Sequence, residues 1–168
     1  MDKEELISEI RSAFDGVTLD GGVSLDEARI MDNYGREGPR EPLAQIPENK
    51  IKHDWSGISS EVLGNFDCVA FLDEKGLRYY LPAFLLHILE NYDPSSMMTI
   101  GTLSALYPKN ETQESNFSAL DDQQRKAIAL FLRFLPEMVE LWGEDVPRVQ
   151  RAYTKYWSKY LVQRESLK

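Results

Sequence analysis

The sequence predicts an all-α fold, a single compact domain of six to eight helices with one long loop that contains proline and glycine. Apolar residues recur at helical spacing in several segments, and capping patterns precede them. Dipeptides of the Asn-Gly or Asp-Gly type do not join two alternating runs, so no β-hairpin is indicated. The length of 168 residues suits one domain, which we place at 1–168.

Two helices are predicted at the start of the chain. Residues 3–14 carry apolar side chains at helical spacing, and Asp2 is placed to cap this helix. Ser24 and Glu27 have the spacing of a capping box, which predicts a second helix that ends near Tyr34. An Asp-Gly-Gly turn lies between the two helices.

A long loop is predicted next, at residues 35–52, because two glycines and three prolines lie there among charged residues. A loop of this length is unusual in a compact domain and is typical of a functional or a mobile segment. Ser59 or Ser60 then caps a short helix, and we interpret 66–72 as a helical turn because no partner strand is evident nearby.

Residues 66–92 hold the densest apolar run of the chain. Asp73 is predicted to cap a turn at 74–78. Pro82 lacks an N–H group, and its ring would clash with the carbonyl group of Arg78 inside one continuous helix. We therefore predict that Pro82 begins a new helix over 82–91, after a corner at residues 80–82.

The second half of the chain predicts three further helices. Residues 95–107 are mildly apolar and form one of them, whereas the polar residues 108–118 indicate a loop. Residues 122–135 follow a capping-box pattern and carry a dense apolar face, which predicts a central helix that Pro136 ends or bends. The last helix is predicted at 145–162, with an apolar stripe of Val146, Val149, Tyr153, Tyr156 and Tyr160.

Charge is distributed unevenly along the chain. The net charge is −9, but residues 148–168 carry +5 and the preceding residues carry −14. An acidic protein is a poor general binder of nucleic acid, because contacts with phosphate need a basic face. For the basic, aromatic helix 145–162 we favour packing on the core, and contact with nucleic acid or a membrane surface is the alternative.

Cys68 is the sole cysteine, so no intramolecular disulfide is possible, and we interpret it as a small buried apolar residue. The absence of a disulfide framework suits a reducing compartment. The chain starts with an acidic amphipathic segment rather than a signal peptide, and no run approaches the ~20 apolar residues of a membrane span. These features predict a cytoplasmic protein.

Catalytic and metal-binding patterns are not evident. His53 and His87 lie far apart and outside any His-Glu-x-x-His pattern, and we interpret His87 as a partly buried side chain beside Glu90. Neither a glycine-rich phosphate loop nor a Gly-x-Ser-x-Gly motif occurs. We therefore predict no catalytic residues, no metal site and no cofactor.

Two short segments are candidates for contact with a ligand or a partner, namely His53-Asp54-Trp55 and Arg78-Tyr79. For the first, we favour a structure in which Trp55 anchors the loop in the core while the other two residues are solvated. For the second, the alternative to ligand contact is a structural role at a corner of the chain. In that case Tyr80 is buried, and Arg78 forms an ion pair with Asp73 or Glu74.

The string Leu72-Asp-Glu-Lys-Gly-Leu-Arg-Tyr-Tyr-Leu-Pro-Ala-Phe84, with Asp54-Trp55 and the Phe66–Leu72 run before it, resembles a family of small, functionally uncharacterised bacterial proteins. That family shares a Trp … Arg-Tyr-Tyr-Leu-Pro-Ala core. The helix start at Leu120–Gln124 is similar to the same family. The resemblance covers about half of the chain and leaves out residues 1–50 and the basic end. It implies a bacterial cytosolic protein and carries over no activity.

Two hypotheses about function follow. The favoured one is a non-catalytic protein-binding or regulatory module, immunity-like in character, which meets a partner with a basic surface through its acidic surface and the 35–55 loop. The alternative is a small enzyme or ligand-binding protein with a pocket near Arg78, Tyr79, His53 and Trp55. The sequence indicates no oligomeric state.

Overall fold

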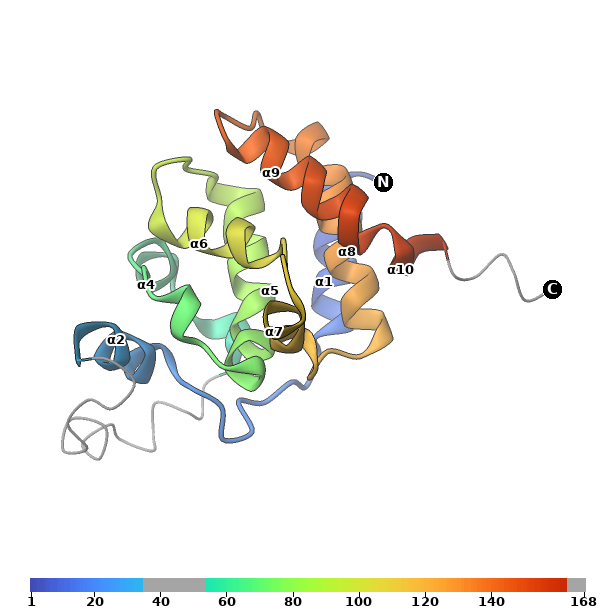
Figure 1. Cartoon of the computed structure of the whole chain (residues 1–168). Helices are drawn as coiled ribbons and strands as arrows, with labels where there is room; N and C mark the ends of the chain where they lie inside the picture. Colours follow the sequence, from blue (N-terminus) through green and yellow to red (C-terminus); the bar gives the residue numbers. More distant parts are fainter. Residues whose placement is uncertain (35–53, 163–168) are drawn as a thin grey trace.

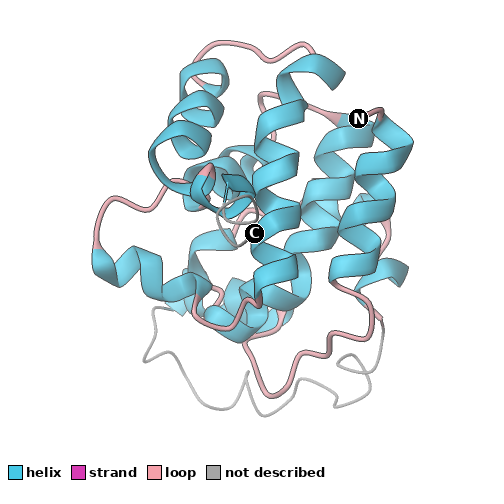
Figure 2. Ribbon diagram, turned by 90° about the vertical axis from the view of Figure 1, so that its right-hand side faces the viewer, coloured by secondary structure: helices cyan, strands magenta, loops and turns pink. Residues whose placement is uncertain are grey.

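The computed structural model describes residues 1–34 and 54–162, and all regular structure within them is helical, which confirms the all-α prediction. Figure 2 shows the helices and the loops that join them. The α-helices are α1 (Lys3–Ala13), α2 (Leu25–Tyr34), α4 (Ser60–Gly64), α5 (Glu74–Asn91), α6 (Met97–Ala105), α7 (Glu111–Glu114), α8 (Asp122–Met138), α9 (Asp145–Ala152) and α10 (Lys159–Val162). The predicted loop 35–52 and His53 lie outside the described residues.

Helix α5 runs through the middle of the molecule, and α1, α4, α6 and α8 pack against it (Figure 1). Helices α1 and α8 pack against each other and against α5, while α4 and α6 contact other parts of α5. Short 3₁₀ turns connect these helices: η2 (Trp55–Gly57), η3 (Val69–Phe71) and η4 (Ser115–Phe117). None of the helices in residues 1–34 and 54–162 combines the length and the apolar character needed to cross a membrane.

The predicted cap at Asp2 and the two predicted capping boxes, at Ser24 and Asp121, are confirmed by hydrogen bonds at three helix starts. The Asp2 carboxylate accepts from the Glu5 N–H at 2.8 Å, and the Ser24 hydroxyl accepts from the Glu27 N–H at 3.2 Å. At the start of α8, the Asp121 carboxylate accepts from the Gln124 N–H at 2.8 Å. Each cap satisfies an amide that has no partner within its own helix, which explains why the local sequence predicts these starts well.

Helix α5 corrects the prediction of a corner at residues 80–82 and a new helix at Pro82. A single helix runs from Glu74 to Asn91 with Pro82 inside it. Twelve of its eighteen residues are buried, and Pro82 is one of them. A proline inside a helix costs about 3 kcal/mol, whereas each large apolar side chain that becomes buried contributes about 1.5–3 kcal/mol. Packing on several sides of α5 therefore outweighs the local preference of Pro82 for a helix start.

Two further boundaries differ from the predictions. The segment predicted as a loop at 108–118 contains α7, which the Asn110 side chain caps by accepting from the Gln113 N–H at 2.9 Å, and then η4. Helix α8 continues past Pro136 to Met138. Pro136 is exposed and lies inside the last turn of the helix rather than at its end.

The last predicted helix, 145–162, is divided into α9, a π-helical turn η5 (Tyr153–Trp157) and α10. The Ser158 N–H donates to the Tyr153 carbonyl, five residues earlier, at 2.8 Å. Within this wider turn, the adjacent side chains of Tyr156 and Trp157 are both buried, whereas Val146 in the first turn of α9 is 48% exposed. The predicted stripe is therefore wrong at Val146, although the favoured packing of the aromatic face on the core is confirmed by buried Tyr156 and Trp157.

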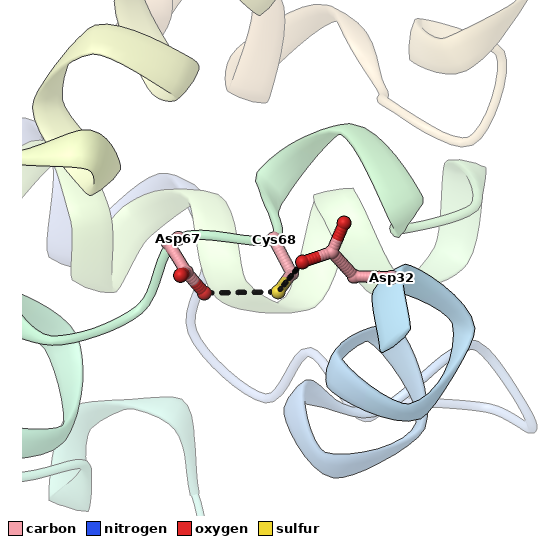
Figure 3. A group of neighbouring side chains, drawn as sticks. All are labelled: Asp32, Asp67 and Cys68. Atoms are coloured by element: carbon pink, nitrogen blue, oxygen red, sulfur yellow. Dashed lines mark hydrogen bonds between the residues drawn. The ribbon is translucent and has the colours of Figure 1, made fainter. Parts of the chain in front are cut away.

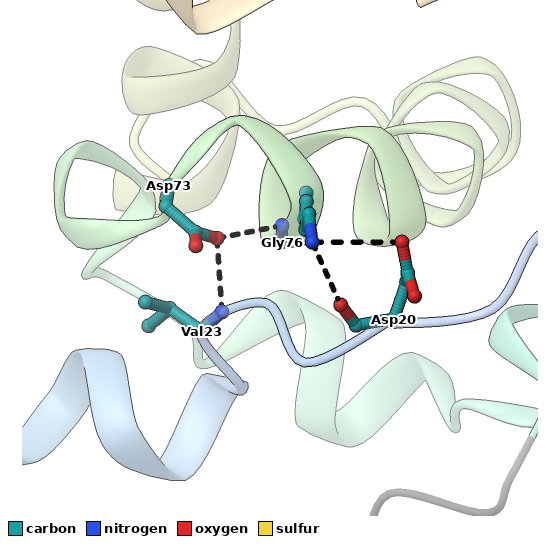
Figure 4. A network of polar contacts seen from close by, with 5 residues as sticks. Asp20, Val23, Asp73 and Gly76 are labelled. Atoms are coloured by element: carbon teal, nitrogen blue, oxygen red, sulfur yellow. Dashed lines mark hydrogen bonds and ion pairs between the residues drawn. The ribbon is translucent and has the colours of Figure 1, made fainter. Parts of the chain in front are cut away.

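The connection between α1 and α2 packs closely against the first turn of α5 (Figure 4). One carboxylate oxygen of Asp73 accepts from the Gly76 N–H at 2.8 Å and from the Val23 N–H at 2.9 Å. Lys75 donates to the Asp20 carbonyl at 3.2 Å. A Cβ atom on Gly22 would lie 2.6 Å from the Gly76 nitrogen, so the two backbones meet where only glycine fits.

Candidate functional site

The segment that follows the predicted loop is attached to the core by Trp55. This side chain is 4% exposed, and its indole N–H donates to the Phe14 carbonyl at 2.9 Å. The exposed Asp54 caps η2 by accepting from the Ser56 N–H at 3.1 Å. The predicted burial of Trp55 in the core and the solvation of Asp54 are thus confirmed, and both side chains take part in local structure.

Tyr79 lines a hollow of about 300 Å³ between the start of α2, the 57–62 segment and α5. The lining residues are Ser24, Leu25, Asp26, Gly57, Ile58, Ser59, Val62, Tyr79 and Tyr80. The Leu25 N–H donates to the Tyr80 phenol oxygen at 3.4 Å. Burial raises the pKa of Tyr79, and Asp54 adds to this effect. Burial also raises the pKa of Tyr80 to about 12, so both phenols are protonated near neutral pH.

Arg78 points to a different part of the molecule from Tyr79. Its guanidinium Nε donates to the Gln124 side-chain oxygen at 3.2 Å, and the same oxygen accepts from the Asp121 N–H at 3.1 Å. The arginine therefore joins α5 to the start of α8, rather than pairing with Asp73 or Glu74. Neighbouring residues on a helix project about 100° apart, which explains why Arg78 and Tyr79 do not meet at one site.

A second hollow, of about 200 Å³, lies on the other side of the 55–60 segment. Trp55, Arg11, His87 and Glu90 are among its lining residues. The Nδ1 atom of His87 is buried and has no hydrogen-bond partner among the described residues. Burial lowers the pKa of His87 and the nearby Glu90 partly opposes this effect, so the imidazole is neutral near pH 7. Within residues 1–34 and 54–162, no hydrogen bond joins His87 to a nucleophile.

Cys68 is buried between two exposed carboxylates, as Figure 3 shows. Its sulfur lies 3.0 Å from an oxygen of Asp67 and 3.6 Å from an oxygen of Asp32 on α2. Burial, followed by the hydrogen bond to Asp67, raises the pKa of the thiol to about 12. The three donor atoms lie within 4.8 Å of one another, which is close enough to contact one metal ion. The thiol would have to lose its proton to bind one, and its surroundings oppose that step.

Cys68 is therefore expected to resist alkylation. At about pH 8.5 a thiol with this raised pKa has roughly a thousand-fold less thiolate than an ordinary cysteine. Iodoacetamide labelling followed by mass spectrometry should be slower by that order in the folded protein than in the same protein in urea. Asp67→Asn should raise the folded rate only in part, because burial remains. Equal rates for folded and unfolded protein would contradict this assignment.

Among the residues whose side chains the structure describes, the most exposed aromatic one lies in the turn between α8 and α9, away from the hollows beside Tyr79 and Trp55. Trp142 is 63% exposed, and Val146, one turn further, is 48% exposed. We call residues 139–146 the Trp142 turn. Three exposed glutamates flank Trp142 in the chain, at positions 137, 140 and 144. A large exposed tryptophan is uncommon on a soluble protein, and an apolar side chain with a charged rim is typical of an interface.

Hydrogen bonds hold the Trp142 turn in one conformation. The Trp142 N–H donates to the Tyr92 phenol oxygen at 3.1 Å, and the Tyr92 hydroxyl donates to Asp145 at 2.7 Å. Arg148 donates to the other oxygen of buried Asp145 at 2.7 Å. Burial and the bond to Asp145 raise the pKa of Tyr92 to about 12, so the phenol keeps its proton and continues to donate. The exposed tryptophan is therefore presented by a preorganised turn.

The predicted site residues thus do not form one cluster in the described structure. Tyr79 lines the larger hollow, Trp55 lines the smaller one, Arg78 contacts Gln124, and His53 lies outside the described residues. Trp142 belongs to no motif of the sequence. The sequence feature that could have indicated its exposure is its position between two glutamates and next to a glycine, outside any apolar stripe of helical spacing.

Comparison with known proteins identifies one family, described as "Family of unknown function (DUF6714)", whose match covers residues 2–161. The match extends well beyond the resemblance seen in the sequence, since it includes the first 50 residues and most of the basic end. No curated protein and no solved structure matches the chain.

Proposed function

Because the chain belongs to this family of unknown function, we propose from its own geometry that it is a non-catalytic module that binds a protein partner with a basic surface. The proposal includes a regulatory, immunity-like role in the bacterial cytoplasm. The Trp142 turn is the contact surface in this proposal, and the 35–55 loop with His53 and Asp54 is a second contact region.

The observation that carries this proposal is the exposure of Trp142 on a turn that hydrogen bonds hold in place. Tryptophan is enriched among the residues that dominate binding energy at protein interfaces, because one ring buries a large area at little conformational cost. Val146, four residues after Trp142, is a second exposed apolar side chain of the Trp142 turn. Since the turn is already ordered, a partner does not have to overcome the entropy of ordering it.

The negative charge around Trp142 supports the proposal that the partner has a basic surface. The exposed Glu140 and Glu144 flank Trp142 at two residues' distance, and Glu137 is exposed at the end of α8. The body of the protein before residue 148 carries −14. Such a field speeds the approach of a basic surface and disfavours an acidic one. An apolar centre with an acidic rim therefore suits a partner that presents an apolar pocket surrounded by lysine and arginine.

Trp142→Ala is expected to weaken partner binding at least about 30-fold, because truncation of such a residue typically removes 2 kcal/mol or more. The partner would be captured from the source cell with the tagged full chain, identified by mass spectrometry, purified and measured by calorimetry. Met97→Ala is the matched control, since Met97 is 56% exposed on α6 and lies outside the Trp142 turn. Equal affinities for the wild type and Trp142→Ala would refute the proposed surface.

A second candidate function rests on the hollow beside Tyr79. Its lining is mainly apolar and aromatic, with Leu25, Ile58, Val62 and Tyr80 around the phenol. Such a hollow suits a small apolar ligand that accepts a hydrogen bond from Tyr79. Fragment screening by NMR tests this candidate, and shifts confined to residues 24–26 and 57–62 would favour ligand binding over a role in protein contact.

A further inference from the structure

Basic side chains gather in a third hollow, between the end of α6 and α9, although the chain as a whole is acidic. The hollow has a volume of about 280 Å³. Its lining residues are Ser104, Tyr107, Lys109, Glu144, Arg148 and Arg151. Three cations and one carboxylate thus face the same space in a protein with 28 acids and 19 basic residues. This balance differs from that of the rest of the surface and points to a negatively charged ligand.

Two of the three cations make no ion pair with a residue that the structure describes. Neither Lys109 nor Arg151 has an ion-pair partner among the described residues, and both side chains are exposed. Arg151 lies three residues after Arg148, so α9 presents both guanidinium groups on one face. Exposed cations that repel one another at close range are stabilised when an anion binds between them.

Arg148 is held in a defined orientation. One of its guanidinium nitrogens donates to Asp145 at 2.7 Å, and the other oxygen of Asp145 accepts from the Tyr92 hydroxyl at 2.7 Å. A guanidinium group carries five N–H donors, so this contact leaves others for a ligand. The hydroxyls of Ser104 and Tyr107 also line the hollow, and neither hydrogen-bonds to another described group.

We propose that this hollow binds the phosphate group of a small phosphorylated molecule, a property that goes beyond the proposed protein-binding function. Phosphate carries close to two charges near neutral pH and has several acceptor oxygens, which match two guanidinium groups, an ammonium group and two hydroxyls. The volume leaves room for an organic group beside the Tyr107 ring. The carboxylate of Glu144, which also lines the hollow, repels a bound anion. Removal of its charge therefore provides an independent test of the site.

The test is a titration of ¹⁵N-labelled full-length protein at constant ionic strength, with inorganic phosphate in one arm and phenyl phosphate in the other. Saturable amide shifts are expected at residues 104–109 and 144–151, with tighter binding of the monoester. Lys109→Gln with Arg151→Gln should weaken binding about tenfold or more, because each substitution removes a charge-assisted contact. Glu144→Gln should tighten binding. Arg29→Gln is the matched control, since Arg29 is exposed on α2.

Three outcomes would overturn the phosphate site: shifts that do not saturate, shifts that spread over other basic residues, or equal affinity in the double variant and the wild type. In those cases the cations only compensate the carbonyl end of α6 and the acidic body. The result is separate from the protein-binding proposal, because Trp142→Ala removes no group that lines this hollow.

Discussion

Replacement of Gly76 by alanine should destabilise the protein by about 3 kcal/mol, although alanine is normally the better helix former by up to about 1 kcal/mol. Gly76 lies in the first turn of α5, where an added Cβ would collide with the Val23 carbonyl and lie 2.9 Å from the Asp73 carboxylate. The collision separates the two backbones. It also breaks the bonds by which Asp73 holds the N–H groups of Val23 and Gly76.

This effect is measurable by thermal unfolding, where 3 kcal/mol in a domain of this size lowers the midpoint by about 6–12 °C. Gly64→Ala is the matched control, because Gly64 is also helical and an added Cβ would meet only the His87 ring at 3.6 Å. That variant should be neutral or slightly more stable. If the two variants unfold at the same temperature, the close approach of Val23 and Gly76 is not as tight as described.

Trp157→Ala is expected to have the largest effect on stability, a loss of about 4–5 kcal/mol. The side chain is fully buried, and its indole N–H donates to the Leu106 carbonyl at 2.6 Å. The Phe117 and Tyr156 rings each lie 5.0 Å from it in edge-on contact. Removal leaves a cavity between the C-terminal helices and α6 and also leaves a buried carbonyl without its donor.

Trp142→Ala is the control for this substitution, because it makes the same change at an exposed position. It should alter the free energy of unfolding by no more than about 0.5 kcal/mol. Trp157→Phe should keep much of the packing and lose the hydrogen bond, with a cost of about 2 kcal/mol. Urea unfolding of the three variants separates these effects. Similar losses for Trp142→Ala and Trp157→Ala would contradict the described burial of the two side chains.

The resemblance string Leu72–Phe84 now has a structural explanation. Asp73 binds the Val23 N–H, Gly76 allows the close approach of Val23, and Tyr80 accepts from the Leu25 N–H. Three residues of the string therefore hold the connection between α1 and α2 against α5. The string therefore specifies how two parts of the fold join.

The helix starts were predictable from the sequence because a cap is a local structure. Asp2, Ser24 and Asp121 bind amides only three residues away, so no distant contact is needed to specify them. The continuous helix through Pro82 was not predictable, because proline by itself favours the first turn of a helix over its interior. The π-helical turn at residues 153–157 likewise depends on the burial of Trp157 against η4 and α6, which the spacing along the chain does not show.

The candidate sites show the same division. The burial of Trp55 was correctly predicted, because a tryptophan that follows a polar segment gains stability by burying its large apolar ring in the core. The pairing of Arg78 with Tyr79 in one pocket was a prediction from adjacency, and the helix turns Arg78 towards Gln124. Trp142 is a candidate contact because it is 63% exposed on a turn that hydrogen bonds hold in place, and the sequence shows neither feature.

By itself, the sequence determined the all-α class, the start of most helices, the burial of Cys68 and the acidic character of the body. These properties depend on composition and on contacts between residues three or four positions apart. The tertiary structure decided the continuity of α5, the register of the C-terminal helices, the exposure of Trp142 and the gathering of Lys109, Arg148 and Arg151 in one hollow. Those properties depend on which distant segments pack together, because burial and convergence are set by the partners of a surface and not by its own residues.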